Sequence, residues 1–513
     1  MTKKVILATN SEFGQANVFL AVGHALQAAD SSVEVHFVSF SPISPYVSEA
    51  SEYSVASSPG ARPWTFHKLD GVTFADAIMG GESGYDSFNC VLSRQPNLIN
   101  TTRLLFDLNR YIIPWTGPEF VEIMKSFVRI ADEIRPDLIM VDSLFAPALT
   151  ACHHHKLDFL VLSPNTLRDF SSALQPWGAL FWKYPMVGTA LVFPIPWHHI
   201  PLNVFYVFLA IFRSLTDPAL YAKRAHIQRE TGAGEIVDMN YLTLWQPSGA
   251  KILVANRPEI EYPMVFPPHL TPCGPMLRPV RPVSEVDPEL ETWLRRGPTV
   301  FVSLGTLLYL EEHEAAEIAG ALQQLLDAVD RLRPDAIAGV PGQLQVLWKL
   351  KNFKRTRGKH EYGTGPGTRI HGILQRALDS DRVRIVDWVK PEPGAILQTG
   401  TVVCSVNHGG ANSFNDAVSS GVPQISLPCW LDCYDFGNRT EILGIGRWGN
   451  KKAKPRYTAQ ELGPILVDVV IGPKADEMRA KVKGLAKLLA DKPGADVAAK
   501  FILGEIDARK VKM

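Results

Sequence analysis

The sequence has no excess of either charge, no paired cysteines and no long apolar run. Its 513 residues include 52 Lys and Arg against 52 Asp and Glu, so bulk electrostatics give no reason to expect nucleic-acid binding. The most apolar run, residues 201–212, is shorter than the roughly 20 residues that cross a bilayer as a helix. Six cysteines lack any Cys-x-x-Cys spacing, which favours buried thiols in a reducing compartment: Cys90, Cys152, Cys273, Cys404, Cys429 and Cys433.

Neither end of the chain has the composition of a targeting or anchoring segment. The apolar run at residues 5–9 is too short for a secretory signal, and the C-terminal tail is charged. The three adjacent histidines His153, His154 and His155 cannot converge on one metal ion from a helix or a strand, and no further ligand cluster follows at metal-site spacing. We therefore expect a cytoplasmic protein without a bound metal.

What the chain does contain is enough apolar sequence for two domains. Hydrophobic residues make up 46% and charged residues 20%, as in globular proteins with sizeable cores. A strand at residues 5–9, a polar turn at 10–17, a helix at 18–29 and a strand at 33–40 form a β-α-β unit. Ligands collect at the carboxyl ends of such strands, which places the polar turn at the rim of a cleft.

The most informative stretch runs from residue 402 to residue 433. An apolar run at 402–406 predicts a buried strand, the glycine-bearing turn 408–413 follows it directly, and 414–420 predicts a short helix that Gly421 and Pro423 end. A strand, a glycine turn and a helix start aim backbone N–H groups and the positive end of a helix dipole at one spot. Phosphate binding is the function this geometry favours, although a plain strand-to-helix turn reads the same way.

Read as a whole, this stretch resembles the donor-binding signature of the inverting UDP-sugar-dependent glycosyltransferases. The likeness is greatest to the soluble fungal members. The matching residues are Trp388, His408, Gly410, Asn412, Ser413, Asp416, Gly421, Val422, Pro423, Pro428 and Asp432. The resemblance implies the arrangement called GT-B, in which two doubly wound α/β domains face each other across a cleft, and an inverting sugar transfer from a UDP-sugar without a metal.

The resemblance also implies a role for each donor-side residue. Trp388 would stack on the uracil, Asp416 would accept from the ribose and Asp432 from the sugar, while the turn around His408 would bind the diphosphate. The full set of donor-side candidates is Gly305, Thr306, Trp388, Val389, His408, Gly410, Ala411, Asn412, Ser413, Asp416, Asp432 and Cys433. Cys433 stands where the family has a glutamine beside the sugar, so the choice of sugar is open, with glucose as the first expectation.

The chain departs from the family at the position of the catalytic base. In the family a histidine follows the glycine of the first polar turn, whereas here Gly14 is followed by Gln15, whose amide cannot accept a proton near neutral pH. Asp142, after a predicted strand at 136–142, matches the aspartate that holds this histidine. It could bond the Gln15 amide, take the acceptor proton itself, or simply cap a helix.

The domain boundaries follow from composition. Residues 1–275 form the predicted acceptor-binding domain, with its last strand at 252–255, and a proline-rich linker leads to the second domain at 276–490. Residues 491–513 contain a last helix that we expect to fold back onto the first domain. Residues 41–118 and 351–370 are predicted to be loops, the former with short helices.

Residues 177–215 are unusually rich in aromatic side chains and proline. Three interpretations remain open for this segment: a buried helix, an apolar wall for the acceptor, or a surface that dips into a membrane. The last two suit an apolar acceptor such as a lipid or a phenol. Two other functions also remain open: a non-catalytic member that binds a nucleotide-sugar or an acceptor, and a sugar-nucleotide epimerase or phosphorylase on the same fold.

Overall fold

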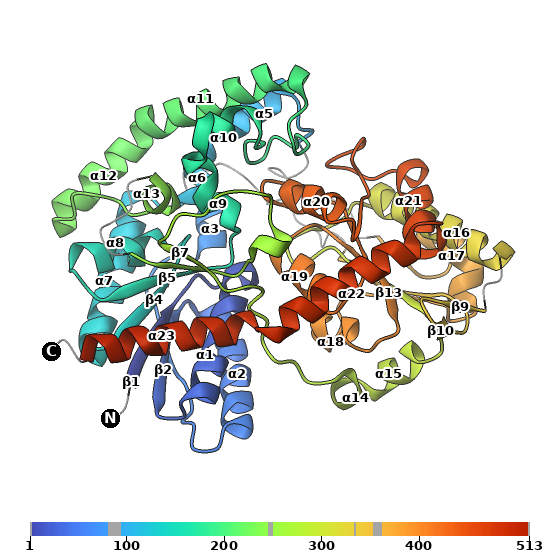
Figure 1. Ribbon diagram of the computed structural model, residues 1–513, viewed down its shortest axis with the longest axis horizontal. Helices are drawn as coiled ribbons and strands as arrows, with labels where there is room; N and C mark the ends of the chain where they lie inside the picture. Colours follow the sequence, from blue (N-terminus) through green and yellow to red (C-terminus); the bar gives the residue numbers. More distant parts are fainter. Residues whose placement is uncertain (1–2, 81–93, 245–249, 333–334, 352–361, 511–513) are drawn as a thin grey trace.

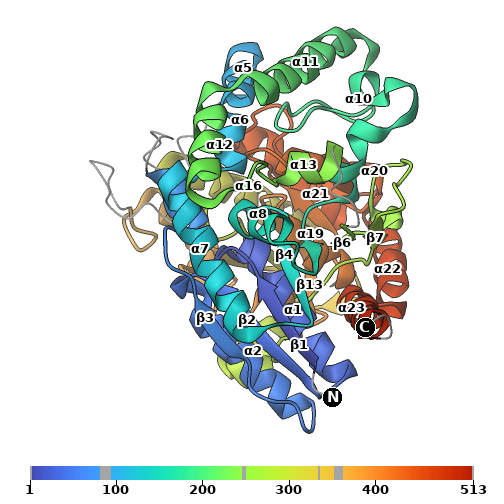
Figure 2. The same ribbon diagram turned by 90° about the vertical axis from the view of Figure 1, so that its left-hand side faces the viewer.

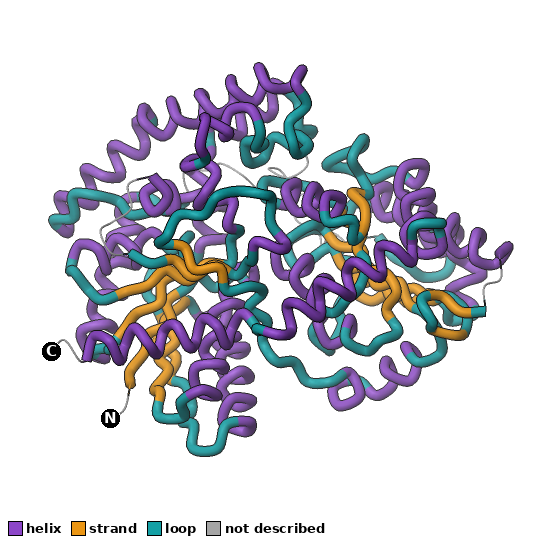
Figure 3. The backbone as a smooth tube through the Cα atoms, in the orientation of Figure 1, coloured by secondary structure: helices purple, strands orange, loops and turns teal. Residues whose placement is uncertain are grey.

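The computed structural model describes residues 3–80, 94–244, 250–332, 335–351 and 362–510. It contains two separate parallel sheets, which Figure 3 shows as two groups of strands at opposite ends of the molecule. The first sheet has seven strands in the order β3-β2-β1-β4-β5-β6-β7: β1 (Lys3–Ala8), β2 (Val33–Ser39), β3 (Thr65–Lys68), β4 (Leu138–Asp142), β5 (Phe159–Ser163), β6 (Ile252–Val254) and β7 (Leu270–Pro272).

Helices cover both faces of this first sheet. The core on one face includes side chains of α1 (Phe13–Ala29) and α23 (Gly494–Lys510), and the core on the other includes α7 (Gly117–Ile134) and α8 (Ala146–His154). Figure 2 gives the view from this end of the molecule. The other helices of this half are α2 (Ser44–Ser57), α3 (Phe74–Met79), α5 (Leu98–Phe106), α6 (Leu108–Ile112), α9 (Leu167–Ser171), α10 (Ala179–Trp182), α11 (Ile200–Thr216), α12 (Pro218–Thr231) and α13 (Met239–Leu244).

The second sheet has six parallel strands in the order β12-β11-β8-β13-β14-β15. Its strands are β8 (Thr299–Ser303), β11 (Gln345–Lys349), β12 (Val383–Val386), β13 (Val402–Asn407), β14 (Gln424–Ser426) and β15 (Gly446–Trp448). Its helices are α14 (Val283–Val286), α15 (Pro288–Leu294), α16 (Glu312–Leu332), α17 (Arg369–Asp379), α18 (Pro393–Leu397), α19 (Ala411–Ser419), α20 (Cys433–Ile442), α21 (Ala459–Ile471) and α22 (Ala475–Asp491). A small antiparallel pair, β9 (Ala336–Ile337) with β10 (Val340–Pro341), lies apart from it.

The sequence of the central strands explains why both sheets are parallel and covered. Every residue of β4, β8 and β13 is buried, as expected for strands with helices on both faces. The prediction of two doubly wound α/β units is therefore confirmed. The five described cysteines are free and buried, and Cys90 lies outside the described residues.

Several element boundaries differ from the sequence prediction. Helix α1 begins at Phe13, so Gly14 and Gln15 belong to its first turn and not to a polar loop. A helix start tolerates such polar residues because its first N–H groups have no partner within the helix. The first sheet continues past residues 252–255 with β7, and residues 41–118 include the 14-residue helix α2 and strand β3. Residues 81–93 and 352–361, which fall in the two predicted loops, lie outside the described residues.

Two features hold the halves together. The last helix, α23, crosses from the second half to pack beside α1 in the first (Figure 1), where Lys251 and Lys3 form ion pairs with Glu505 and Asp507. Nearer the cleft, Arg168 bonds Asp435 at 2.5 Å across the junction.

A second ion pair at the junction is almost fully buried. The Arg439 guanidinium donates to Glu261 Oε1 from Nε at 2.8 Å and from Nη2 at 2.5 Å, and the two side chains are 1% and 0% exposed. Glu261 also accepts the Arg168 backbone N–H. Charges buried this far from water depend on their partners, so this pair fixes how the two halves meet.

Helix α11 is mostly exposed, so the first interpretation of residues 177–215, a buried helix, is wrong. Only Asn203, Tyr206 and Val207 are buried along its length, and the buried Asn203 amide bonds the backbone of α10. Three of its rings, those of Phe205, Phe208 and Phe212, are exposed outside the cleft lining, and the exposed Ile211 and Leu215 line the cleft. By length and composition, the segment Trp197–Thr231 is apolar enough to cross a membrane. An 18-residue window within it has a mean hydropathy of 1.3, and 17% of this window is buried.

Candidate functional site

A cleft of about 1520 Å³ runs between the two halves at the carboxyl ends of the two sheets. Nearly all of the site residues predicted from the sequence line it: Gln15, Gly305, Thr306, Trp388, Val389, His408, Gly410, Ala411, Asn412, Ser413, Asp416, Asp432 and Cys433. Gln15 comes from the first half. The others come from four separate stretches of the second half, and the fold brings them to one wall because the strands that precede them are parallel. Asp142 is the exception and does not line the cleft.

The turn after β13 is fixed by the side chain of Asn407, the last residue of that strand. Asn407 Oδ1 accepts the Gly409 N–H at 2.9 Å, and the Asn407 amide donates to Gln424 on the next strand. Gly409 has φ +75, and a Cβ there would lie 2.9 Å from the Cys433 carbonyl oxygen, so only glycine fits. Helix α19 then starts without a side-chain cap. Its first N–H groups are thus available to an anion.

The ring of His408 is clamped between two glycines, Gly305 in the turn after β8 and Gly410 in the turn after β13. A Cβ at Gly305 would lie 2.8 Å from His408 Cε1, and one at Gly410 would lie 2.3 Å from His408 Nε2. Burial, and then the charge of Lys349, lowers the pKa of His408 to about 4. The imidazole is therefore neutral at pH 7 and can donate one N–H, and its Nδ1 has no partner within the protein.

Trp388 presents a ring to the cleft and is 52% exposed. The Lys349 ammonium lies 4.5 Å from the centre of this ring, and burial together with Lys351 lowers the pKa of Lys349 to about 8. An aromatic face in an open cleft offers a stacking surface for a planar base. Lys349 is the last residue of β11, and it was not predicted as a site residue because its sequence context is that of an ordinary strand end.

Two carboxyl groups on this wall have strongly raised pKa values. Burial, and then Glu392, raises the pKa of Asp416 to about 7, against the opposing effect of Arg278. Burial also raises the pKa of Asp432 to about 7. Near neutral pH each can exist in either protonation state, so each can accept or donate a hydrogen bond to a hydroxyl group. Burial also keeps the neighbouring Cys433 thiol protonated, because it raises the pKa well above its usual value.

Asp142 lies beneath the cleft and is fully buried. Its carboxylate accepts the Leu144 N–H at 2.9 Å, the Thr9 hydroxyl at 3.0 Å and the Asn10 amide at 3.5 Å. The Gln15 amide is not among these three donors, so the predicted bond between Gln15 and Asp142 is not how Asp142 is held. A carboxylate outside the cleft, already engaged by three donors, is badly placed to take a proton from a bound acceptor.

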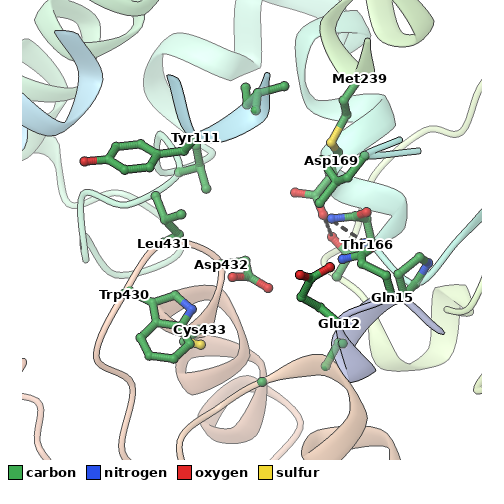
Figure 4. Close-up of a pocket in the computed structure, with 18 of the residues that line it drawn as sticks. Glu12, Gln15, Tyr111, Thr166, Asp169, Met239, Trp430, Leu431, Asp432 and Cys433 are labelled. Carbon is green, nitrogen blue, oxygen red and sulfur yellow. Dashed lines mark hydrogen bonds between the residues drawn. The ribbon is translucent and has the colours of Figure 1, made fainter. Parts of the chain in front are cut away.

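Glu12 lines the cleft immediately before α1 and is not among the site residues predicted from the sequence. Figure 4 shows its carboxylate pointing toward Asp432, with Gln15 and Thr166 beside it. The sequence could have indicated a role for it, since Glu12 is the one ionisable residue in the turn 10–17. The family resemblance places the base at the position of Gln15 instead.

The other wall of the cleft is mostly apolar and belongs to the first half. Figure 4 shows Tyr111 and Met239 on opposite sides of the cavity, with Leu431 reaching in from the second half. Further apolar lining residues come from helices of the first half: Phe74, Ile78, Leu105, Leu108, Ile112, Val207, Ile211 and Leu220. Among the described residues, no group of three or more His, Cys, Asp or Glu side chains could hold a metal ion.

Comparison with known proteins agrees with this geometry. Residues 374–500 match the family model described as the erythromycin biosynthesis protein CIII-like C-terminal domain. Glycosyltransferase sdnJ of Sordaria araneosa is 30% identical over 519 residues, covering 98% of this chain and 94% of that protein. A UDP-glycosyltransferase of Talaromyces amestolkiae is 27% identical over 41% of this chain and 37% of its own length.

The fold also has solved relatives. Phytolacca americana UGT2, in complex with UDP-2-fluoroglucose and pterostilbene, superimposes with a TM-score of 0.60 at 15% identity, covering 99% of both chains. This likeness confirms the GT-B arrangement of two facing Rossmann-like domains. The full-length match to a glycosyltransferase, the domain match and the shared fold together establish that the chain is a glycosyltransferase and belongs to the UDP-glycosyltransferase family.

Proposed function

We propose that the protein transfers glucose from UDP-glucose to a hydroxyl or carboxyl group of a small apolar or phenolic acceptor, with inversion and without a metal. The observation that carries the proposal is the clamped turn at His408, because it joins an uncapped helix start to a neutral imidazole at the cleft wall. Such a site stabilises the negative charge that develops on a departing diphosphate. Trp388, Asp416 and Asp432 on the same wall suit a base, a ribose and a sugar in turn.

The apolar wall supports the choice of acceptor. Its aliphatic and aromatic side chains would be favourably covered by an apolar ring system, at roughly 25 cal/mol per Å² of area removed from water. UGT2 of Phytolacca americana is a precedent for a UDP-sugar analogue and pterostilbene bound together in this fold. Cys433 offers a protonated thiol, which is a weak hydrogen-bonding group, so discrimination between sugars would rest mainly on Asp432.

The exposed face of α10 and α11 supports a contact with a lipid surface, as an extension of the same proposal. Trp177, just before α10, and Trp197, just before α11, are 92% and 82% exposed, and tryptophan favours the boundary between a membrane and water. Residues 170–216 contain Lys183 and Arg213 but no acidic residue, so nothing in this segment repels an anionic headgroup. Because Val207 and Ile211 of α11 also line the cleft, an apolar acceptor could enter directly from the lipid side.

An acceptor screen tests the function. We expect UDP release from UDP-glucose that requires an apolar or phenolic acceptor, and a product whose glycosidic bond is inverted relative to the donor. Equilibrium binding of UDP without turnover on any acceptor would identify a non-catalytic binding protein, the alternative that Gln15 favours. A chemically altered sugar formed from UDP-glucose alone would identify an epimerase.

A further inference from the structure

Glu12 lines the cleft with one carboxylate oxygen fixed by a hydrogen bond and the other without a partner. One carboxylate oxygen, Oε1, accepts the Ala75 N–H at 2.8 Å, which fixes the side chain against the start of α3. The other oxygen, Oε2, is buried and has no partner within the protein. A buried carboxylate oxygen left unpaired is costly, and such groups in a cleft are candidates for function. Glu12 precedes Gln15 by three residues, so the two lie one helical turn apart at the start of α1.

A contact across the cleft brings this helix start to the donor wall. Asn412, in the first turn of α19, donates its amide to the Phe13 carbonyl oxygen at 3.1 Å. The start of α1 is thus bonded directly to the helix start that would hold the donor diphosphate. Glu12, one residue before Phe13, points across the cavity toward Asp432, on the side where the sugar would lie (Figure 4).

The other carboxyl groups near the cleft are engaged or lie on the donor side. Asp142 is buried beneath it and has three hydrogen-bond donors. Asp169 accepts the Thr166 N–H and hydroxyl, each at 2.9 Å, and closes a capping box at the start of α9. Asp432 belongs to the wall that we assign to the donor. Elsewhere on the first-half wall, Glu235 pairs with Arg224, Asp238 accepts from Asn240 and Tyr241, and Glu49 is exposed to solvent. Among the described carboxyl groups of this wall, Glu12 is the one that has a buried oxygen without a partner.

The surroundings of Glu12 also suit proton transfer. Burial, and then the negative charges of Asp142 on β4 and Asp76 on α3, raises the pKa of Glu12 to about 7. Asp432 and Asp169 face it from the other sides of the cavity. A general base is most effective when its pKa lies near the working pH, because it is then ionised and still basic enough to take a proton.

We propose that Glu12 is the general base of the transfer, acting where the family has a histidine and this chain has Gln15. The inference rests on the proposed function. In this step the acceptor O–H bond breaks and its proton goes to Glu12 Oε2, while the acceptor oxygen bonds to the anomeric carbon of the sugar. The bond from that carbon to the β-phosphate oxygen breaks, and UDP departs with the electron pair. Glu12 then returns its proton to water.

The test is Glu12→Gln, with Glu52→Gln as the matched control. Glutamine keeps an oxygen for the Ala75 N–H but cannot take a proton, and Glu52 is an exposed glutamate on α2 in the same half, outside the cleft. Turnover is measured against pH with an aliphatic alcohol and with 4-nitrophenol as acceptors, and UDP affinity is measured at equilibrium. We expect wild-type turnover with the alcohol to rise with pH through about 7.

In Glu12→Gln, turnover with the alcohol should fall by about 10²–10⁴-fold and lose this rise with pH. Turnover with 4-nitrophenol, which is readily ionised, should fall much less, and UDP affinity should not change. Glu52→Gln should behave as the wild type. Adding Gln15→His to Glu12→Gln should restore part of the alcohol activity, since it places an imidazole at the family position.

The possible failures are distinguishable. An active protein whose Glu12→Gln variant keeps the alcohol rate and its rise with pH overturns the assignment of Glu12. A wild type that binds UDP and never transfers sugar overturns the proposed function, and the role of Glu12 with it. If Glu12→Gln does not fold, Glu12→Asp decides the question: a working base predicts reduced turnover that still rises with pH, and unchanged turnover contradicts the proposal.

Discussion

The two walls of the cleft bind their ligands by different physical means. On the donor wall the backbone forms the site: Gly305 and Gly409 adopt left-handed conformations, and the ring of His408 fits only because its glycine neighbours have no Cβ. On the acceptor wall, side chains from helices of the first half form an apolar surface that is partly open to solvent. A backbone site tolerates little change, whereas a side-chain surface can change residue by residue.

The two walls face each other only if the two halves stay in place, so we expect the largest effect at the buried Glu261–Arg439 pair between them. Glu261→Gln would leave the Arg439 guanidinium buried without its countercharge, so we expect the free energy of unfolding to fall by about 3–5 kcal/mol. Denaturant unfolding monitored by tryptophan fluorescence measures this. Glu259→Gln, an exposed glutamate two residues away, should change stability by less than about 1 kcal/mol. Equal effects at the two positions would mean that the buried pair does not hold the halves together.

The second largest effect is expected on the donor wall. His408→Ala removes an N–H donor from the diphosphate site and should raise the activation barrier of sugar transfer by about 2.7–4 kcal/mol. The loss should appear in kcat, measured by UDP release at saturating donor and acceptor, and should be similar for every acceptor. His313→Ala, at an exposed position in the same half, is the control. A loss that depended strongly on the acceptor would contradict the separation of the two walls.

The smallest effect on chemistry is expected at the outer face of α11. Replacing Phe208 and Phe212 by serine removes two exposed rings, 59% and 57% accessible, of which Phe208 also contacts the Phe181 ring at 5.2 Å between ring centroids. We expect sedimentation with anionic liposomes to be lost, while kcat with a water-soluble phenol changes less than about twofold. Leu332→Ser, exposed on α16 in the other half, should leave sedimentation unchanged. Persistent liposome binding in the double variant would exclude this face as the membrane contact.

The sequence alone determined the features that local physics decides. Continuous apolar runs predicted the buried parallel strands, because a strand covered on both faces needs no polar side. Glycine and the helix start after β13 predicted the donor turn, because backbone geometry and capping depend on a few adjacent residues. For the same reason nearly the whole donor set could be named by residue, and it lies along one cleft wall.

Tertiary packing decided what the sequence left open or predicted wrongly. Whether the apolar helix α11 was buried or exposed depended on which elements packed against it, and only three of its residues found partners in the core. Asp142 ends one strand of the first sheet and Glu12 follows another, yet one carboxylate lies beneath the cleft and the other inside it. The Asn412–Phe13 contact that brings Glu12 to the donor wall joins residues 399 positions apart. Sequence patterns report periodicity and turns over a few residues, whereas the direction of a side chain is fixed by neighbours that the folded chain brings from far away.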